Sequence, residues 1–400
     1  MQDQNSKPET APGTGNAREV FLAFLPLGVT AFGGPVAHLG FFRTAFVEKR
    51  RWLSDAAYAD LVALCQFLPG PASSQVGMAL GLERAGYLGM LAAWTAFTLP
   101  SALVMAAFGL ILGSAGVGEG APWLFGLKAA AVAVVAHALL GMAGSLAATR
   151  ERATIAALAF MIVLLVPDRV VGQLAVIVLG GAAGLGLRGD AADGAAPAAA
   201  MPQSRALGAV SLVLFLVLLA ALPVLAHLAP ALDLFDRVYR AGALVFGGGH
   251  VVLPLLEAEV RPMVDPSAFL AGYGAAQAMP GPLFTFAAYL GAVAEPFGGV
   301  AGAAVALVAI FLPGALLVLA VMPFWHAVRR IGWVRKVLAG VNAAVVGLLA
   351  AAFYDPVFVR GITSEAALCL AVAAFIALRQ WSAPPWAVVV ASGALGAAFL

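Results

Sequence analysis

Long apolar segments recur along the whole chain, and no other feature of the sequence limits the possible folds so strongly. They lie at 21–47, 57–82, 85–113, 121–148, 153–166, 170–187, 207–229, 235–257, 267–291, 297–325, 335–353, 364–378 and 384–400. Most are near or above the roughly 20 residues that a helix needs to cross a bilayer. Only 10% of the 400 residues are charged and 62% are hydrophobic, whereas soluble domains carry roughly 25% charged residues. The sequence therefore predicts a membrane protein.

The spanning elements are expected to be helices. An open strand in lipid leaves backbone N–H and C=O groups unpaired, and the sequence lacks the alternating pattern of barrel strands. The predicted fold class is an all-α polytopic membrane protein. The segments at 153–166 and 364–378 are short for spanning, so they are expected to tilt or to stay shallow.

The two halves of the chain repeat one pattern. The tract Phe32-Gly33-Gly34-Pro35 recurs 214 positions later as Phe246-Gly247-Gly248-Gly249. The tract from Gln66 to Pro71, which ends in Pro-Gly-Pro, recurs 211 positions later from Gln277 to Pro282. Internal duplication in a polytopic membrane protein is typical of secondary transporters.

Glycine and proline interrupt matching apolar segments in both halves. The Gly-Gly-Pro or Gly-Gly-Gly tract and the following Pro-Gly-Pro remove backbone donors and helical propensity where a spanning helix needs both. The sequence therefore predicts two repeats with broken or re-entrant helices. The alternative is a continuous helix that is kinked at proline, or glycine used for close helix packing.

We expect five parts: a polar cytoplasmic N-terminus at 1–20, a first repeat at 21–187, a cytoplasmic linker at 188–205, a connecting transmembrane helix at 206–234, and a second repeat at 235–400. If 21–47, 57–82 and their counterparts are re-entrant, most of the 22 Lys and Arg residues lie on the cytoplasmic side with the N-terminus. An odd number of crossings then separates corresponding segments. The second repeat is therefore expected to be inverted relative to the first.

Broken helices of this kind predict an anion site. A helix that starts inside the membrane directs unpaired N–H groups and the positive end of its dipole at the break. Four breaks from two inverted repeats are expected to converge near the midplane of the bilayer. The candidate substrate-binding residues are Gly33, Gly34, Pro35, His38, Gln66, Gly70, Pro71, Ser73, Ser74, Gly247, Gly248, Gly249, His250, Gln277, Gly281, Pro282 and Thr285.

Simpler interpretations of these side chains stay open. Hydroxyl groups near a helix start often bond to a local carbonyl group instead of a ligand. His38 and His250 either contact the anion, relay a proton, or serve only in packing.

Ionisable residues within apolar segments are candidates for coupling transport to a second ion. They are Arg43, Asp60, Lys128 and Glu257. Arg43 and Glu257 occupy equivalent positions in the two repeats, and an exposed interfacial location is the simpler interpretation of both.

Several function classes are not expected. The two cysteines and five scattered histidines form no metal-binding spacing, so neither a metal nor another cofactor is predicted. An intramembrane enzyme would need a nucleophile, paired acids or a metal set, and none stands at a suitable spacing. The net charge of +2 gives no reason to expect nucleic acid as a partner. The expected partners are a small anion and the lipid bilayer, with a homodimer as a candidate assembly.

At these motifs the sequence resembles the chromate ion transporter family. The resemblance rests on Phe32-Gly33-Gly34-Pro35 with His38, on Trp52, and on the two Pro-Gly-Pro tracts, and it extends from about residue 20 to the C-terminus. It implies a two-repeat protein of the bacterial inner membrane that exports chromate, a tetrahedral dianion isosteric with sulfate, and so confers chromate resistance. A transporter or channel for sulfate or another small anion is the alternative. Gly249 replaces Pro35 in the second repeat, so the two tracts need not bind alike.

Overall fold

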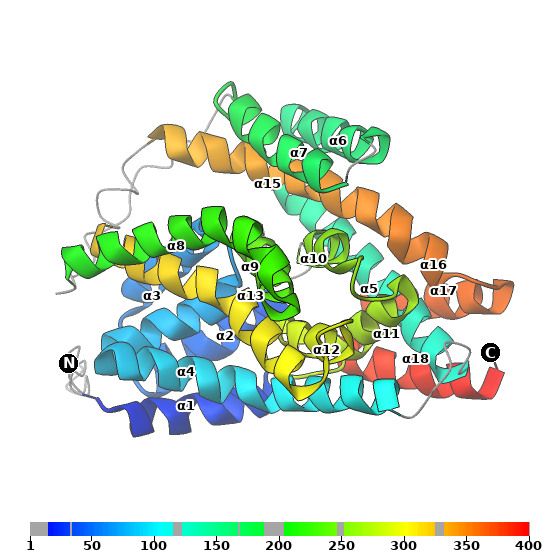
Figure 1. Cartoon of the computed structure of the whole chain (residues 1–400), viewed down its shortest axis with the longest axis horizontal. Coiled ribbons are helices and arrows are strands. Elements are labelled where there is room, and N and C mark those ends of the chain that lie inside the picture. Colours follow the sequence, from blue (N-terminus) through cyan, green and yellow to red (C-terminus); the bar gives the residue numbers. More distant parts are fainter. Residues whose placement is uncertain are drawn as a thin grey trace, which may run out of the picture.

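The computed structural model describes residues 15–32, 34–114, 122–166, 169–187, 204–245, 252–324 and 332–399. All regular secondary structure in these ranges is helical (Figure 1). The first half contains α1 (Ala17–Thr30), α2 (Gly34–Phe42), η1 (Arg43–Lys49), α3 (Asp55–Phe67), α4 (Ala72–Ser114), α5 (Pro122–Leu146), α6 (Arg150–Leu165) and α7 (Arg169–Gly184).

The second half contains α8 (Arg205–Leu225), η2 (Ala226–Leu228), α9 (Pro230–Leu244), α10 (Val252–Val260), α11 (Pro266–Ala276), η4 (Leu283–Thr285), α12 (Phe286–Val293), α13 (Gly299–Val321), η5 (Met322–Phe324), α15 (Gly332–Ala352), η6 (Phe353–Phe358), α16 (Val359–Gly361), α17 (Glu365–Arg379) and α18 (Pro385–Phe399). Five helical stretches of the described chain are long and apolar enough to cross a membrane. They are Ala72–Leu112, Pro122–Gly144, Arg205–Leu228, Gly299–Phe324 and Ala339–Gly361. Fold and composition together define an all-α polytopic membrane protein.

The helices at the glycine-rich tracts are discontinuous, as the sequence predicts. α1 ends before Ala31, which has an extended backbone, and α2 begins at Gly34. In the second repeat α9 ends before Val245, which is also extended, and α10 begins at Val252. A continuous helix kinked at proline is therefore excluded at these two places.

α4 is a helical hairpin and not one straight rod. Its backbone leaves the helical region at Ala85 and Gly86, and Gly86 has a φ of +66°. The two arms meet so closely that a Cβ atom at Gly81 would lie 2.3 Å from the carbonyl oxygen of Gly89. α12 and α13 repeat this arrangement, since a Cβ atom at Gly291 would lie 2.1 Å from the Gly302 oxygen. This turn lies between the segments expected at 57–82 and 85–113, and the first of them contains α3 and the first arm of α4.

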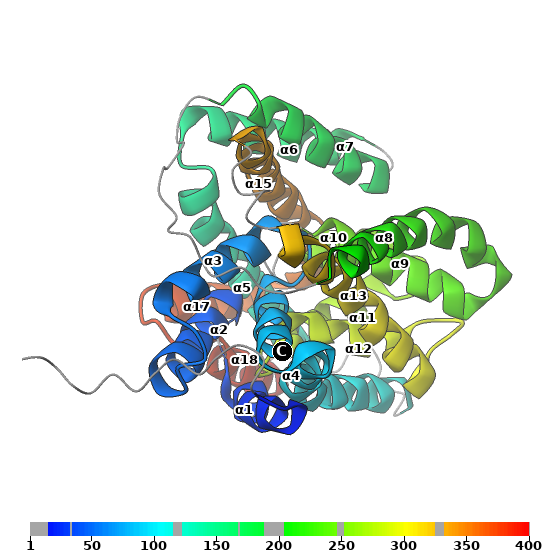
Figure 2. The ribbon, with the colours of Figure 1, turned by 90° about the vertical axis from the view of Figure 1, so that its left-hand side faces the viewer.

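The last helices of each repeat pack on the other repeat. α6 and α7 lie along α15, whereas α17 and α18 lie along α5 (Figures 1 and 2). The contacts use equivalent glycines. A Cβ atom at Gly340 would lie 2.0 Å from the Gly180 oxygen, and one at Gly126 would lie 2.0 Å from the Ser392 oxygen. We call these two groups of helices the exchanged arms, and each of them contains helices from both repeats.

Candidate functional site

Each Pro-Gly-Pro turn is bonded to the broken helix of the other repeat. The backbone N–H of Gly70 donates to the carbonyl oxygen of Val245 at 2.8 Å, directly after α9. The backbone N–H of Gly281 donates to the carbonyl oxygen of Ala31 at 2.9 Å, directly after α1. The four interruptions therefore meet in two reciprocal pairs, and both pairs join one repeat to the other.

The turns require glycine at their central positions. The φ angle is +124° at Gly70 and +80° at Gly281, a region that other residues rarely adopt. A Cβ atom at Gly70 would also lie 3.3 Å from Cα of Gly314, and one at Gly281 would lie 3.0 Å from the carbonyl oxygen of Phe97. Gly314 belongs to α13 and Phe97 to α4, so each turn packs against the long helix of the opposite repeat.

His38 connects the two pairs. Its side chain is only 1% exposed, with Nε2 placed 3.1 Å from the carbonyl oxygen of Ala31 and Nδ1 placed 3.3 Å from Oγ of Ser73. Because a carbonyl oxygen only accepts, Nε2 carries the proton, and Nδ1 of the neutral ring accepts from the Ser73 hydroxyl. Ala31 thus receives bonds from both Gly281 and His38. A single buried ring links the break after α1, the start of α4 and the second Pro-Gly-Pro turn.

Four buried polar atoms near the turns have no hydrogen-bond partner within the described ranges. They are Oγ of Ser74, Oε1 of Gln75, Oγ1 of Thr98 and Nε2 of Gln277. Gln75 is completely buried, and its Nε2 donates to the carbonyl oxygen of Pro69 at 2.8 Å. Unsatisfied buried polar groups are uncommon in native structures and mark positions that a ligand can complete. Gln75 and Thr98 are not among the candidates predicted from the sequence, although a polar side chain inside an apolar helix is a signal that could identify them.

The remaining candidates differ in their surroundings. Thr285 is buried, but its hydroxyl donates to the carbonyl oxygen of Pro282 at 2.9 Å, which is the local bond considered as the alternative. Gln66 is exposed, unlike its equivalent Gln277. Pro71 and Pro282 are buried within their turns, and Gly34 and Pro35 are partly buried at the start of α2. Gly33, Gly247, Gly248, Gly249 and His250 lie outside the described residues.

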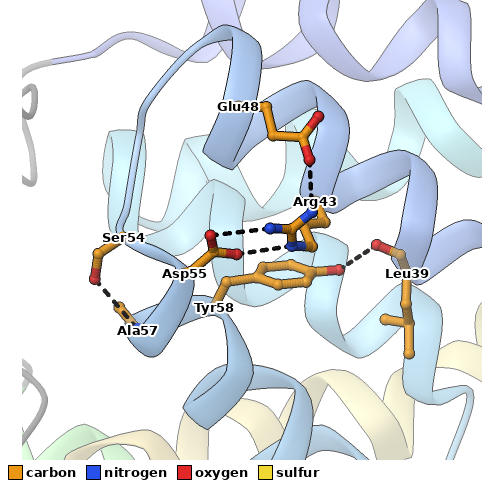
Figure 3. Close-up of polar contacts among 7 residues, drawn as sticks. All are labelled: Leu39, Arg43, Glu48, Ser54, Asp55, Ala57 and Tyr58. Atoms are coloured by element: carbon orange, nitrogen blue, oxygen red, sulfur yellow. Dashed lines mark hydrogen bonds and ion pairs between the residues drawn. The ribbon is translucent and has the colours of Figure 1, made fainter.

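Arg43 lies at an exposed surface. Its Nε is 2.7 Å from Oδ1 of Asp55 and its Nη1 is 2.5 Å from Oε1 of Glu48, so the guanidinium joins η1 to the start of α3 (Figure 3). Hydrogen bonding and the charge of Asp55 raise the pKa of Arg43, with a smaller contribution from Glu48. Beside it, the Tyr58 hydroxyl donates to the carbonyl oxygen of Leu39 at 2.6 Å. The structure therefore shows Arg43 as an exposed, ion-paired residue.

The other coupling candidates are distributed over separate elements. Lys128 is 3% exposed, donates to Oγ of Ser267, and has its Nζ 5.0 Å from the centre of the Phe125 ring. Since Ser267 belongs to α11, Lys128 joins the two repeats. Glu257 is buried in α10, so it is not an exposed interfacial residue. Asp60 belongs to α3, and its side chain lies outside the described part of the structure. Within that part, no group of three or more His, Cys, Asp or Glu side chains is placed to hold a metal ion.

The fold and this centre define a membrane protein with two linked repeats that join their broken helices around buried polar groups. The chain matches the family model described as chromate transporter over residues 18–185 and 232–397, and it belongs to that family. This family is one of transporters and not of enzymes.

Curated relatives cover most of the chain. The chromate transport protein of Pseudomonas aeruginosa is 29% identical over 366 residues, which are 87% of this chain and 82% of that protein. A probable chromate transport protein of Synechococcus elongatus is 28% identical, covering 88% and 87%. The chromate transport protein of Cupriavidus metallidurans is 28% identical, covering 86% and 83%. No solved structure matches the chain.

Proposed function

We propose that the protein is a secondary transporter that exports chromate across a bacterial inner membrane and thereby confers chromate resistance. Membership of the chromate transporter family supports an anion substrate. The names of the relatives support chromate as that anion, and the five long apolar helices support a multi-pass membrane location. A cytoplasmic N-terminus, inferred from the distribution of Lys and Arg, is part of the proposal.

The observation that carries the proposal is the meeting of the interruptions around His38. Secondary transporters bind substrate between their repeats, where discontinuous helices end inside the membrane. The bonds from Gly281 to Ala31 and from Gly70 to Val245 join the two repeats beside helix ends, and this supports a substrate site between the repeats. We therefore place the substrate site beside these two bonds, with the tract at 246–251 as a further part of it.

Chromate bound here is held by neutral donors. The hydroxyls of Ser74 and Thr98 and the Nε2 group of Gln277 are buried donors with no partner in the described ranges. The first N–H groups of α4, which lack intrahelical acceptors, add the positive end of a helix dipole. The amides of Gly70 and Gly281 are already bonded to carbonyl groups in this conformation. The anion therefore relies first on the hydroxyl and side-chain amide groups.

We propose that the two exchanged arms are the parts of the protein that move relative to each other during transport. Rocking of the two sequence halves as rigid units would separate α15 from α6 and α7, and α5 from α17 and α18. These helices approach at glycine with almost no space between the backbones. Movement of one exchanged arm against the other preserves those contacts. The two cross-repeat bonds at Gly70 and Gly281 lie outside the exchanged arms, and we propose that they open in turn as the arms move, one on each side of the substrate.

The membrane potential favours export of a dianion. Moving one elementary charge across the membrane changes its free energy by about 2.3 kcal/mol per 100 mV, so a dianion gains about twice that when it leaves an inside-negative cell. Uniport is therefore energetically sufficient, and coupling to a second ion is an addition and not a requirement.

The test is uptake of radiolabelled chromate into everted membrane vesicles, with vesicles that lack the protein as the baseline. We expect Thr98→Val to reduce uptake by removing a buried hydroxyl without a partner. Thr95→Val is the matched control, because the Thr95 hydroxyl lies on the same helix and bonds only to the carbonyl oxygen of Leu91. Uptake equal to the baseline would refute chromate transport. Equal effects of the two variants would refute this position of the site.

Excess unlabelled sulfate separates the anions. If sulfate abolishes chromate uptake and is itself accumulated faster, the substrate is another tetrahedral oxyanion. Collapse of the membrane potential with an ionophore tests the driving force, since uptake by uniport should fall with it. A flux that does not saturate with chromate concentration would indicate a channel and contradict alternating access.

A further inference from the structure

A buried network of charged side chains joins α9 to α10, the two helices on either side of the second glycine-rich tract. Nη2 of Arg240 lies 2.9 Å from Oδ2 of Asp236 and 3.0 Å from Oε2 of Glu259. The side chains of Asp236 and Glu259 are 3% and 6% exposed, and that of Arg240 is 26% exposed. Two carboxylates therefore share one guanidinium group at a site from which water is largely excluded.

The charges of this network do not balance. The neighbouring Arg237 is paired with Asp233 at 2.8 Å, and its Nη1 donates to the backbone oxygen of Glu259 at 3.1 Å. Arg237 thus neutralises Asp233, while Arg240 serves both Asp236 and Glu259. One negative charge remains, and Oδ1 of Asp236 has no hydrogen-bond partner among the described residues. Two carboxyl groups that share a buried site favour holding one proton between them.

In the described part of the chain, Arg240 is the residue that forms ion pairs with Asp236 and Glu259, and no other helix contributes one. α13 carries no ionisable residue, and the one titratable residue of α11 is Tyr273. α8 has one charged residue, Arg205 at its start. Ten positions further along, α8 meets α9 near Phe215, whose backbone oxygen accepts a hydrogen bond from the Tyr239 hydroxyl at 3.1 Å. Glu257, the other carboxyl group of α10, is buried and has interactions of its own. The ionisable residues on the remaining contacting elements are His227 of η2, Arg169 near the start of α7, and Arg335 and Lys336 near the start of α15.

The network is specific to the second repeat. The residues 214 positions before Asp236, Arg240 and Glu259 are Leu22, Pro26 and Ala45, none of which is charged. The repeated fold therefore does not need these charges for its assembly. α9 leads directly to Val245, the acceptor of the Gly70 N–H. The charged network consequently lies on the helices that hold one of the two cross-repeat bonds.

We propose that Asp236 and Glu259 form a proton-binding site that couples chromate export to proton entry. The inference rests on the proposed transport function. A proton on either carboxyl group removes the excess charge and frees one of the two bonds to Arg240. α10 then separates from α9 at the second interruption, and loss of the proton restores the contact. A proton taken up from the outside and released to the cytoplasm moves opposite to the exported anion.

The test uses the purified full-length protein in liposomes, with two driving forces applied separately. Asp236→Asn and Glu259→Gln replace each carboxyl group by a neutral amide. The matched control is Asp55→Asn, whose carboxylate is 61% exposed and paired with Arg43, away from this network. With the membrane potential clamped at zero, a pH gradient should drive chromate flux in the wild type and in Asp55→Asn, but not in the other two variants. Protonation of chromate itself is common to all four proteins.

A spectroscopic measurement keeps this test independent of transport. Infrared difference spectra between acidic and alkaline buffer should show the carbonyl band of a protonated carboxyl group in the wild type, and Asp236→Asn and Glu259→Gln should weaken it. An unchanged band and an unchanged response to the pH gradient in both variants would overturn the proposal. If wild-type liposomes carry no chromate flux but the band behaves as expected, the transport function fails and the proton site stands.

A further variant guards against misfolding. Asp236→Leu, Arg240→Met and Glu259→Ala combined replace the whole network by apolar residues, a change that buried ion networks often tolerate without loss of stability. This triple variant should retain chromate flux driven by the membrane potential and lose the response to the pH gradient. Retention of both responses would contradict the proposal.

Discussion

The backbone N–H of Gly281 donates a hydrogen bond to the carbonyl oxygen of Ala31, 2.9 Å away in the other repeat. Glycine is needed there, because φ is +80° and an added Cβ atom would lie 3.0 Å from the Phe97 oxygen. We expect Gly281→Ala to displace the turn, to lower the unfolding temperature in detergent and to abolish chromate uptake into everted vesicles.

Gly299→Ala is the control for the effect of an unfavourable backbone conformation alone. Gly299 also has a positive φ, +71°, but no heavy atom lies within 4 Å of an added Cβ. Both substitutions therefore carry the left-handed penalty of roughly 1–2 kcal/mol, and only Gly281→Ala disturbs the contact between the repeats. Equal loss of uptake in the two variants would show that the cross-repeat contact is not the cause.

Adjacent serines at the start of α4 should respond differently to substitution. The Ser73 hydroxyl bonds to His38, so Ser73→Ala leaves a buried ring nitrogen unsatisfied and should destabilise the protein by about 1–3 kcal/mol. The Ser74 hydroxyl has no partner in the described ranges, so Ser74→Ala should leave stability nearly unchanged and raise the KM for chromate. Chemical denaturation and initial rates of uptake measure the two effects. The reverse pattern would place the anion on Ser73.

Substitutions of the two glutamines that precede the Pro-Gly-Pro turns should have unequal effects on the KM for chromate. Gln277 has a buried Nε2 group without a partner in the described part of the chain, whereas Gln66 is exposed. Gln277→Leu should therefore raise the KM for chromate more than Gln66→Leu does. Concentration series of labelled chromate measure the difference. A larger effect at Gln66 would indicate that the first repeat, and not the second, provides the amide donor.

Arg43 should not take part in proton exchange. Asp55 raises the pKa of Arg43 further above neutrality, so its charge is constant through the working range of pH. Arg43→Lys should keep the pH profile of uptake, and Asp55→Asn should cause only a small fall in unfolding temperature, since the pair is exposed. A shifted pH profile in Arg43→Lys would return Arg43 to the coupling candidates.

The positions of the breaks follow from local chemistry, which is why the sequence predicts them. Glycine and proline act on their own backbone, so Gly70 and Gly281 identify the turns in any tertiary context. The acceptors of these amides, Val245 and Ala31, are far away along the chain. A hydrogen bond between distant segments leaves no periodic pattern, and the reciprocal pairing therefore emerges only from the structure.

The residues of the candidate site could likewise be predicted from the sequence only in part. His38 was expected to serve either in packing or at the site, and its bonds to Ala31 and Ser73 could not be derived from spacing. The network of Asp236, Arg240 and Glu259 was missed because the repeat comparison emphasised shared residues. These charges have no counterpart in the first repeat, so only the differences between the halves would have revealed them.

The exchange of helices between the repeats also constrains biogenesis. Gly180 and Gly184 of α7 pack against Gly340 and Lys336 of α15, which the ribosome makes much later than α7. Until α15 enters the bilayer, the matching surfaces of α6 and α7 have only lipid or an insertion factor beside them. The N-terminal half is therefore not a finished folding unit when it is inserted, and its native packing is completed only after helices of the second repeat have been synthesised.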